Sequence, residues 1–415
     1  MKSSFHLFRC LALAISLILF CHCSQAQFLK KLKDKVTQTA SDHVTNDAGN
    51  ATDKAIDKTE SSAGNTAKEN NKENSGNQPS DNNSDNNVAS NNSSSVPTIK
   101  SYQNYDFVPG DTVIFQSNLA EEQVGEIPSQ FTLENGQMDI QNEDGENVIH
   151  VPKGAGATMT PRMARNNYMP DQFTVEFDFK NEKAGVEHFY VDFGQRVYYS
   201  GGDGIIPGIT FGYDGITWGA LNSGIPEGLH INYDYPNQWH HIAIAINKNA
   251  GKVYIDQYRV MNVNSLNGKP NNVTIDVNGY ENSYIKNIRI AAGGIDIYKK
   301  VTTDAKIIMH GIQFDVDKAT LKPESMGSIN QVYTLLKKDA SLKFEVDGHT
   351  DNTGQAAHNL TLSQQRADAV KAQLVKMGID GSRLTTKGFG DTKPISDNNS
   401  PEGKANNRRV EFVKI

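Results

Sequence analysis

The chain has 415 residues, more than one ordinary domain holds, so the sequence predicts two folded domains with accessory segments. Its formal charge of −7 at pH 7 argues against a nucleic-acid-binding protein, because such proteins carry a basic excess. Hydrophobic residues make up only 37% of the chain, so part of it is not expected to form a packed core.

Residues 1–26 have the pattern of a secretory signal peptide. Lys2 and Arg9 precede the apolar run LALAISLILF, and SQA then supplies the small residues at which signal peptidase cuts. This run is shorter than the roughly 20 apolar residues that span a bilayer. All three cysteines lie in the segment, so the mature chain is expected to have neither disulfides nor a thiolate metal site.

Residues 27–100 are predicted to form a largely disordered tether. They are rich in Asn, Ser, Asp and Lys, and such a composition cannot bury enough apolar surface to offset the loss of chain entropy. At the start of this segment, FLKKLKDKVTQTASDHV carries apolar residues three and four positions apart. That spacing fits either a weak amphipathic helix on a membrane surface or a solvated tail.

Residues 101–300 are predicted to form an all-β sandwich. QFTVEFDFK and HIAIAI alternate between apolar and other residues, and Gly, Asn and Pro separate such segments. WHHIAIAINKNAGKVYIDQYRV, followed by YIKNIRIAA, resembles the concanavalin A-like (laminin-G-like) jelly roll. The resemblance implies a β-sandwich that binds a protein or a glycan.

An enzymatic role for this sandwich depends on two carboxylates. Glu176 and Asp178 lie on one face of a predicted strand, with Glu182 beyond them, and glycoside hydrolysis needs two carboxyl groups about 5–5.5 Å apart. The alternative is that they form the polar, solvent-exposed face of an antiparallel sheet. The sequence favours this second interpretation. In jelly-roll glucanases the third acid follows the pair sooner, whereas here Lys180 and Asn181 lie between Asp178 and Glu182.

Two other side-chain types in the sandwich invite functional interpretations. Trp218 and Tyr213 are candidates for a sugar-binding surface, although aromatic residues more often pack in a core. His240 and His241 are adjacent, so on a strand they point to opposite faces and are not expected to share a zinc ion. The wall-anchored enzyme and the lectin therefore stay as alternative functions.

Residues 301–415 alternate between strand and helix patterns, which predicts a compact βαβαβ domain with helices on one face of a small sheet. AKIIMHGIQF, SLKFEVDGH, RLTTKGFG and NRRVEFVKI are the expected strands. LKPESMGSINQVYTLLKK and HNLTLSQQRADAVKAQLVKMG are the expected helices, with Pro323 near the start of the first and Gly378 at the end of the second.

This last domain closely resembles the OmpA-like peptidoglycan-binding domain. The matching motifs are FDVDKATLKPES, GHTDNTG, NLTLSQQRA, GFGDTKPI and NNRRVEF. The resemblance implies a non-enzymatic protein of the Gram-negative periplasm, associated with the outer membrane or cell wall. It binds peptidoglycan and needs no cofactor. Other envelope proteins are further expected partners.

The resemblance also assigns a binding site. Its ligand is meso-diaminopimelate of the stem peptide, whose free end carries an ammonium and a carboxylate on one carbon. Asp351 is expected to receive the ammonium and Arg366 the carboxylate. His349 is assigned to packing, and no metal cluster is expected. The family pattern adds further peptidoglycan-binding candidates, which are Asn359, Thr353, Asp317, Arg408 and Arg409. Of the adjacent Arg408 and Arg409, only one is expected to face the ligand.

Overall fold

The computed structural model divides the chain into two units, of which the second, Ser90–Ile415, contains every described residue. The expected signal peptide, nearly all of the expected tether and Tyr213 lie outside the described residues. In the part of the chain that is described, no helix is both long and apolar enough to cross a membrane. The described residues are 98–182, 189–194, 206–212, 215–226, 229, 237–294 and 297–415.

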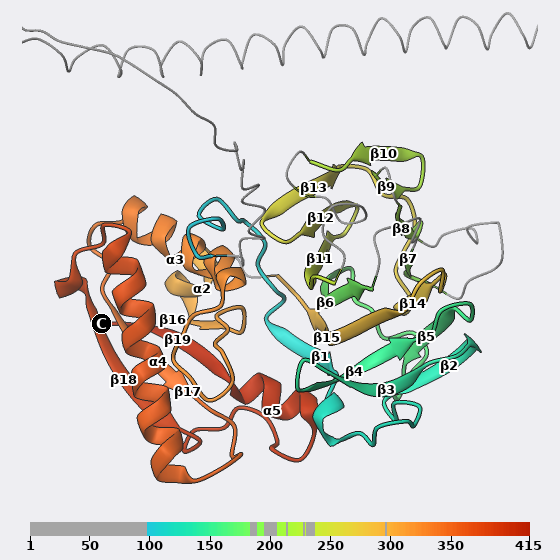
Figure 1. Ribbon diagram of the computed structural model, residues 1–415. Helices are drawn as coiled ribbons and strands as arrows, with labels where there is room; N and C mark the ends of the chain where they lie inside the picture. Colours follow the sequence, from blue (N-terminus) through green and yellow to red (C-terminus); the bar gives the residue numbers. More distant parts are fainter. Residues whose placement is uncertain are drawn as a thin grey trace, which may run out of the picture. The chain divides into compact units, whose positions relative to one another are not determined.

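The described residues between 112 and 292 contain fifteen strands (Figure 1), together with the short 3-10 turn η1 (Leu119–Glu121). The strands are β1 (Thr112–Gln116), β2 (Phe131–Gly136), β3 (Asp139–Glu143), β4 (Glu146–Val151), β5 (Ala157–Pro161), β6 (Gln172–Asn181), β7 (Phe189–Asp192), β8 (Ile209–Phe211), β9 (Gly215–Trp218), β10 (Leu221–Gly224), β11 (His240–Asn247), β12 (Ala250–Ile255), β13 (Tyr258–Val263), β14 (Thr274–Val277) and β15 (Ser283–Ala292).

These strands form two antiparallel sheets. The eight-stranded sheet has the order β13-β12-β11-β6-β15-β4-β3, with β1 paired to β15, and the seven-stranded sheet has the order β10-β9-β8-β7-β14-β5-β2. The apolar side chains of the alternating segments fill one core between the sheets, including Phe173, Val175 and Phe177 of β6. The region is therefore mostly β-sheet, as expected, while the jelly-roll resemblance stays a prediction.

Trp218 belongs to this core rather than to a sugar-binding surface. Its side chain is only 1% exposed, and its indole Nε1 donates a hydrogen bond to the Pro207 carbonyl oxygen at 2.9 Å. A Cβ added at Gly251 would lie 2.2 Å from the Trp218 ring, so the glycine is needed for this close packing. The interpretation of Trp218 as an exposed sugar platform is wrong.

Residues 297–415 form an α/β domain. Its elements are α2 (Ile297–Thr303), β16 (Lys306–Met309), the 3-10 turn η2 (Pro323–Ser325), α3 (Met326–Lys338), β17 (Phe344–His349), α4 (Ala356–Lys376), the 3-10 turn η3 (Gly381–Arg383), β18 (Leu384–Gly390), α5 (Pro401–Asn407) and β19 (Arg409–Lys414). The sheet order is β16-β19-β17-β18, with β17 and β18 parallel and the other pairs antiparallel.

The expected strands and the two long helices are confirmed. On α4, Ala367, Val370 and Leu374 are buried as the helical spacing predicts, whereas Leu360 is exposed and Leu362 is buried in its place. The helices α2 and α5 were not expected. Because α2 packs against β16 and α3, it belongs with this domain, and the sandwich ends at β15 rather than at residue 300.

The outer face of the eight-stranded sheet is buried around Glu176, contrary to the expectation of a solvent-exposed face there. Ala243 of β11 and Tyr254 of β12 join the core of the C-terminal domain, together with aromatic residues of the segment 102–107. Glu176 lies directly opposite Ala243 in the β6–β11 pairing, so its side chain points to the same face, and Glu176 is only 2% exposed. This part of the face therefore packs against the rest of the chain instead of meeting water.

Candidate ligand-binding site of the C-terminal domain

Asp351 lies in the loop between β17 and α4, and the loop's own hydrogen bonds fix its conformation. The Thr353 backbone N–H donates to Asp351 Oδ1 at 2.9 Å, which is an Asx turn. Asn359, in the first turn of α4, donates through Nδ2 to the carbonyl oxygens of Asp351 at 3.3 Å and Thr353 at 3.1 Å. Asn359 thus holds the loop in place, and Asp351 itself is only 7% exposed.

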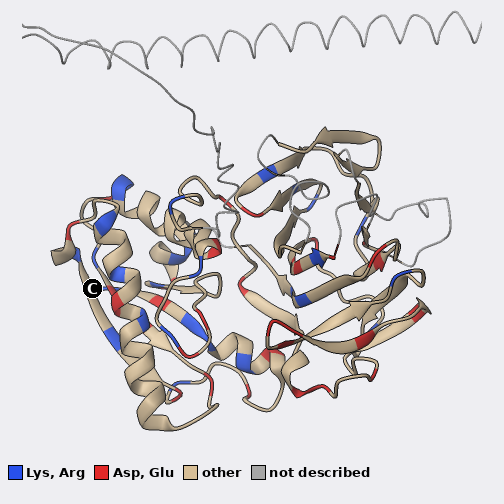
Figure 2. Ribbon diagram, viewed as in Figure 1, with Lys and Arg blue, Asp and Glu red and all other residues tan. Residues whose placement is uncertain are grey.

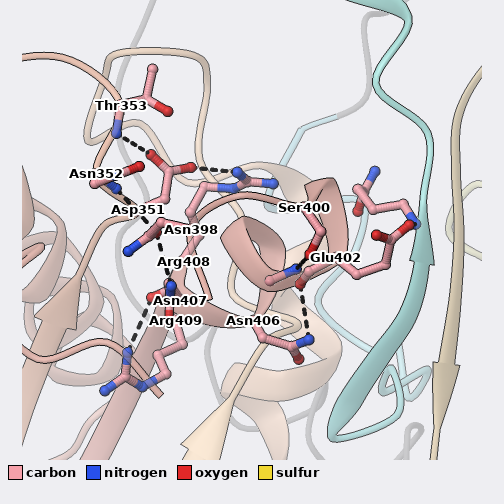
Figure 3. A network of polar contacts seen from close by, with 12 residues as sticks. Asp351, Asn352, Thr353, Asn398, Ser400, Glu402, Asn406, Asn407, Arg408 and Arg409 are labelled. Carbon is pink, nitrogen blue, oxygen red and sulfur yellow. Dashed lines mark hydrogen bonds and ion pairs between the residues drawn. The ribbon is translucent and has the colours of Figure 1, made fainter. Parts of the chain in front are cut away.

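Arg408, at the C-terminal end of α5, forms an ion pair with Asp351 (Figure 3). The Arg408 side chain is 44% exposed and that of Asp351 is 10% exposed. Burial alone would raise the pKa of Asp351, but hydrogen bonds from Arg408 and the Thr353 N–H outweigh it and lower the pKa. Asp351 is therefore a carboxylate at neutral pH, and Arg408 is its cationic partner.

Arg366 approaches the same place from the middle of α4. Its Nε donates to the Lys318 carbonyl oxygen at 3.0 Å, its Nη2 donates to the Asp315 carbonyl oxygen at 3.4 Å, and its guanidinium lies 5.0 Å from the Phe314 ring centroid. Within residues 299–415, which the structure describes throughout, no hydrogen bond or ion pair joins Arg366 to Asp351. The two charges are not neutralised by each other.

Electrostatic coupling nevertheless links these groups. Burial lowers the pKa of Arg366, the charge of Arg408 lowers it further, and Asp317 and Asp351 act in the opposite direction. Lys and Arg are otherwise interspersed with Asp and Glu along both domains (Figure 2). Arg366 and Arg408 thus lie beside the carboxylates of Asp351 and Asp317, so charges of both signs are available to a ligand at this place.

The other candidates are placed differently. Asp317 has a φ of 56° in the turn before α3, and its exposed carboxylate contacts His358 Nε2. Arg409 is 4% exposed, and its Nε donates to Glu411 Oε1 at 2.7 Å. The structure brings Asp351, Thr353, Asn359 and Arg408 together by direct contacts, with Arg366 nearby; it does not bring Arg409 to them.

A set of asparagines that sequence reasoning missed holds this site together. Asn407 is fully buried; its Nδ2 donates to Asn398 Oδ1 at 2.9 Å, and Asn398 Oδ1 also accepts the Asn352 backbone N–H at 3.3 Å (Figure 3). The residue after Asn407 is Arg408. The signals in the sequence are the asparagine-rich run DNNSPEGKANNRR, which by composition alone reads as a loop, and the family motif NNRRVEF, whose asparagines were assigned no role.

The short helix α5 also joins the site to the sandwich. Ser400 caps α5 by accepting the Gly403 N–H at 3.0 Å. Asn406 exchanges two hydrogen bonds of 2.9 Å with the backbone of Val113 in β1, and Glu402 accepts the Gln116 N–H at 3.2 Å. Since α5 ends at Arg408, the residue that pairs with Asp351 is carried by the helix that binds β1.

Comparison with known proteins identifies the domain that contains this site. Residues 313–408 match the OmpA family. The chain carries an OmpA family domain at its C-terminal end. The resemblance expected from the motifs is confirmed for this domain, which contains Asp351, Arg366 and Arg408.

Relatives of the OmpA family domain include envelope proteins of several bacteria. The probable lipoprotein YiaD of Escherichia coli (strain K12) is 44% identical over 104 residues, which are 25% of this chain and 48% of the relative. The peptidoglycan-binding protein ArfA of Mycobacterium bovis is 42% identical over 102 residues, 25% of this chain and 31% of the relative. The chain thus spans less than half the length of these relatives.

Among solved structures, the crystal structure of the peptidoglycan-associated lipoprotein from Burkholderia pseudomallei is similar to this region. It is 27% identical, the alignment covers 25% of this chain and 88% of that chain, and the TM-score is 0.24. The two relatives with the higher identity are thus a probable lipoprotein and a peptidoglycan-binding protein.

Proposed function

We propose that the OmpA family domain binds peptidoglycan without cleaving it, and that diaminopimelate of the stem peptide binds between Asp351 and Arg366. The single observation that carries the proposal is the ionised Asp351 beside two guanidinium groups, with Arg366 not paired to it. The 42% identity, over 102 residues, to a protein named as peptidoglycan-binding supports the proposal that this domain binds peptidoglycan.

The free end of diaminopimelate matches these charges. Its carboxylate binds Arg366, whose position is set by the Lys318 and Asp315 carbonyls, and it is also attracted by Arg408. Its ammonium binds Asp351, taking the place that the half-exposed Arg408 occupies in the free domain. Each sheltered charge-assisted hydrogen bond contributes about 1.5–3 kcal/mol, so two of them give selectivity for a zwitterionic end rather than very tight binding.

The rest of the chain fits an exported envelope protein. An N-terminal signal peptide and tether would place the folded domains in the periplasm, attached to the wall, with the sandwich as an interaction module for a protein or glycan. The enzymatic alternative finds no support in the described residues. Glu176 is buried on the face that packs against the C-terminal domain, Asp178 beside it is partly buried, and His241 contacts both carboxylates.

Sedimentation with purified sacculi tests the binding proposal. We expect Arg366→Ala to weaken binding about 10- to 150-fold, the loss of one charge-assisted hydrogen bond. Asp351→Asn should have a similar effect while keeping the side-chain shape. Lys376→Ala, an exposed cation in the last turn of the same helix, is the matched control and should bind normally.

A competition assay identifies the recognised group. Free diaminopimelate should displace the wild-type protein from sacculi, whereas cadaverine, which has ammonium groups but no carboxylate, should not. Undiminished sacculus binding by the Asp351→Asn/Arg366→Ala double variant, with a normal circular dichroism spectrum, would show that the ligand binds elsewhere.

A further inference from the structure

A second group of polar side chains lies in the C-terminal domain on the sheet face that points away from α4. Gly348 faces α4, because a Cβ added there would lie 2.1 Å from the Ser363 carbonyl oxygen. Its neighbours along β17, Asp347 and His349, therefore point to the other face. Glu411 of β19 is paired with Asp347, so it shares that face.

These three side chains converge. One ligand atom from each of Asp347, His349 and Glu411 lies within 4.8 Å of the other two, and the residues are 6%, 4% and 4% exposed. Both ring nitrogens of His349 and Oδ1 of Asp347 are buried without a hydrogen-bond partner. Buried polar atoms without partners are unfavourable in folded proteins and point to a bound water or ion.

We propose that Asp347, His349 and Glu411 bind one divalent transition-metal ion, for which Zn²⁺ is the suitable probe. Zinc binds imidazole nitrogen at about 2.0–2.1 Å and carboxylate oxygen at about 2.0–2.2 Å with tetrahedral geometry, so its ligand atoms lie about 3.4 Å apart. His349 Nε2 lies 3.9 Å from Glu411 Oε1, and the ligand atoms of the three residues lie within 4.8 Å of one another, so the side chains must move about 0.5–1.5 Å closer together to bind the ion.

The surroundings orient the proposed ligands. The His349 ring stacks on Phe389 at a centroid distance of 5.2 Å, which fixes the direction of its nitrogens. Glu411 accepts from Arg409 Nε at 2.7 Å and pairs with Lys306 Nζ at 3.0 Å. Each carboxylate oxygen has a second lone pair, so these cations can hold Glu411 in place while it binds a metal ion, as outer partners of metal ligands do.

The side chains on this face carry charges of both signs. The carboxylates of Asp347 and Glu411 lie beside His349, both of whose ring nitrogens are buried without a hydrogen-bond partner, while Arg409 and Lys306 pair with Glu411. An imidazole ligand favours Zn²⁺ over Ca²⁺ or Mg²⁺, which prefer all-oxygen sites.

Isothermal titration calorimetry of the full chain with ZnCl₂ at pH 7, after removal of metals by a chelator, tests the proposal. We expect one saturable site in the wild-type protein and no heat with MgCl₂. Asp347→Asn, which keeps the side-chain shape but removes a ligand charge, should weaken Zn²⁺ binding at least tenfold. His358→Ala is the matched control, because His358 and Asp317 form an exposed pair that would capture zinc adventitiously; this variant should keep the site.

Co²⁺ in place of Zn²⁺ supplies a second readout. Coordination by the His349 nitrogen should give visible absorption bands that His349→Gln abolishes, with folding of the variant checked by circular dichroism. Absence of a saturable Zn²⁺ site in the wild-type protein would overturn the proposal and leave a buried water as the partner of these atoms. Equal Zn²⁺ affinity in Asp347→Asn and wild type would overturn it as well.

Discussion

Glu176→Gln tests how much the buried ion pairs of Glu176, on the outer face of the eight-stranded sheet, contribute to the free energy of unfolding. Glu176 Oε1 lies 3.8 Å from Arg289 Nη1, and Glu176 Oε2 lies 3.8 Å from His241 Nε2. At an effective dielectric constant of about 20, each such pair is worth about 4 kcal/mol before desolvation. Burial raises the pKa of Glu176, and the charges of Arg289 and His241 oppose that rise without cancelling it.

Among the described residues, removal of the Glu176 charge leaves the buried Arg289 with the His310 carbonyl oxygen, 3.3 Å from its Nη1, as its one direct acceptor. Breaking one partner of a buried pair costs about 3–5 kcal/mol. Because both contacts of Glu176 exceed hydrogen-bonding distance, we expect the lower end, a loss of about 3 kcal/mol in the free energy of unfolding.

Urea unfolding at pH 7, followed by tryptophan fluorescence, measures this loss. The double variant Glu176→Gln/Arg289→Met removes both charges and should recover at least half of the lost stability. Glu121→Gln, an exposed acid in η1, is the matched control and should change the unfolding free energy by less than about 0.5 kcal/mol. If Glu176→Gln is as stable as this control, the cluster is solvated and the reasoning from burial fails.

Three further outcomes follow from other contacts. Asp178 raises the pKa of His241 to about 9 against the effect of burial, so the protonated His241 stabilises the fold fully below pH 6.5. This contribution to the unfolding free energy should fall as the pH rises through 9. Asp178→Asn should flatten that part of the stability–pH curve. Gly327→Ala should loosen the segment 102–107, because its Cβ would lie 1.7 Å from the Phe107 carbonyl oxygen; limited proteolysis measures this. Trp218→Ala should lower the unfolding free energy by about 3–5 kcal/mol in urea and leave sacculus binding unchanged.

The elements that sequence reasoning predicted well are those with a strong local period. The helical spacing along α4 and the alternation in β6 each identify one buried face, and the structure buries those faces. The same alternation cannot tell whether the second face of β6 meets water or another part of the chain. Glu176 was therefore assigned to solvent, although Ala243 and Tyr254 beside it belong to a second core.

The site was predictable only where its residues share a motif. Asp351, Thr353 and Asn359 lie within nine positions of one another, and their contacts are local. The pairing of Asp351 with Arg408 spans 57 positions and depends on α5, which has no apolar period and begins with a Ser cap and a proline. The convergence of residues 347, 349 and 411 depends on the register of β17 and β19, which no local pattern encodes.

Because Arg408 forms an ion pair with Asp351, the ammonium group of a ligand must displace Arg408 to bind this carboxylate. An unpaired Asp351 in a sheltered loop would bear a desolvation penalty, and a direct pair with Arg366 would leave no charge for a ligand. With Arg408 as the partner, Asp351 stays ionised while Arg366 is satisfied only by carbonyl oxygens and the Phe314 ring. A bound ammonium then exchanges with one half-exposed guanidinium.

A variant of Arg408 can test whether this residue only competes with the ligand for Asp351 or also attracts the ligand carboxylate. Arg408→Ala removes the internal competitor for Asp351 but also removes a cation that attracts the ligand carboxylate. We expect weaker binding of sacculi with a smaller salt dependence, because one positive charge fewer acts on the ligand. Tighter binding by this variant at every salt concentration would mean that Arg408 acts only as a competitor for Asp351.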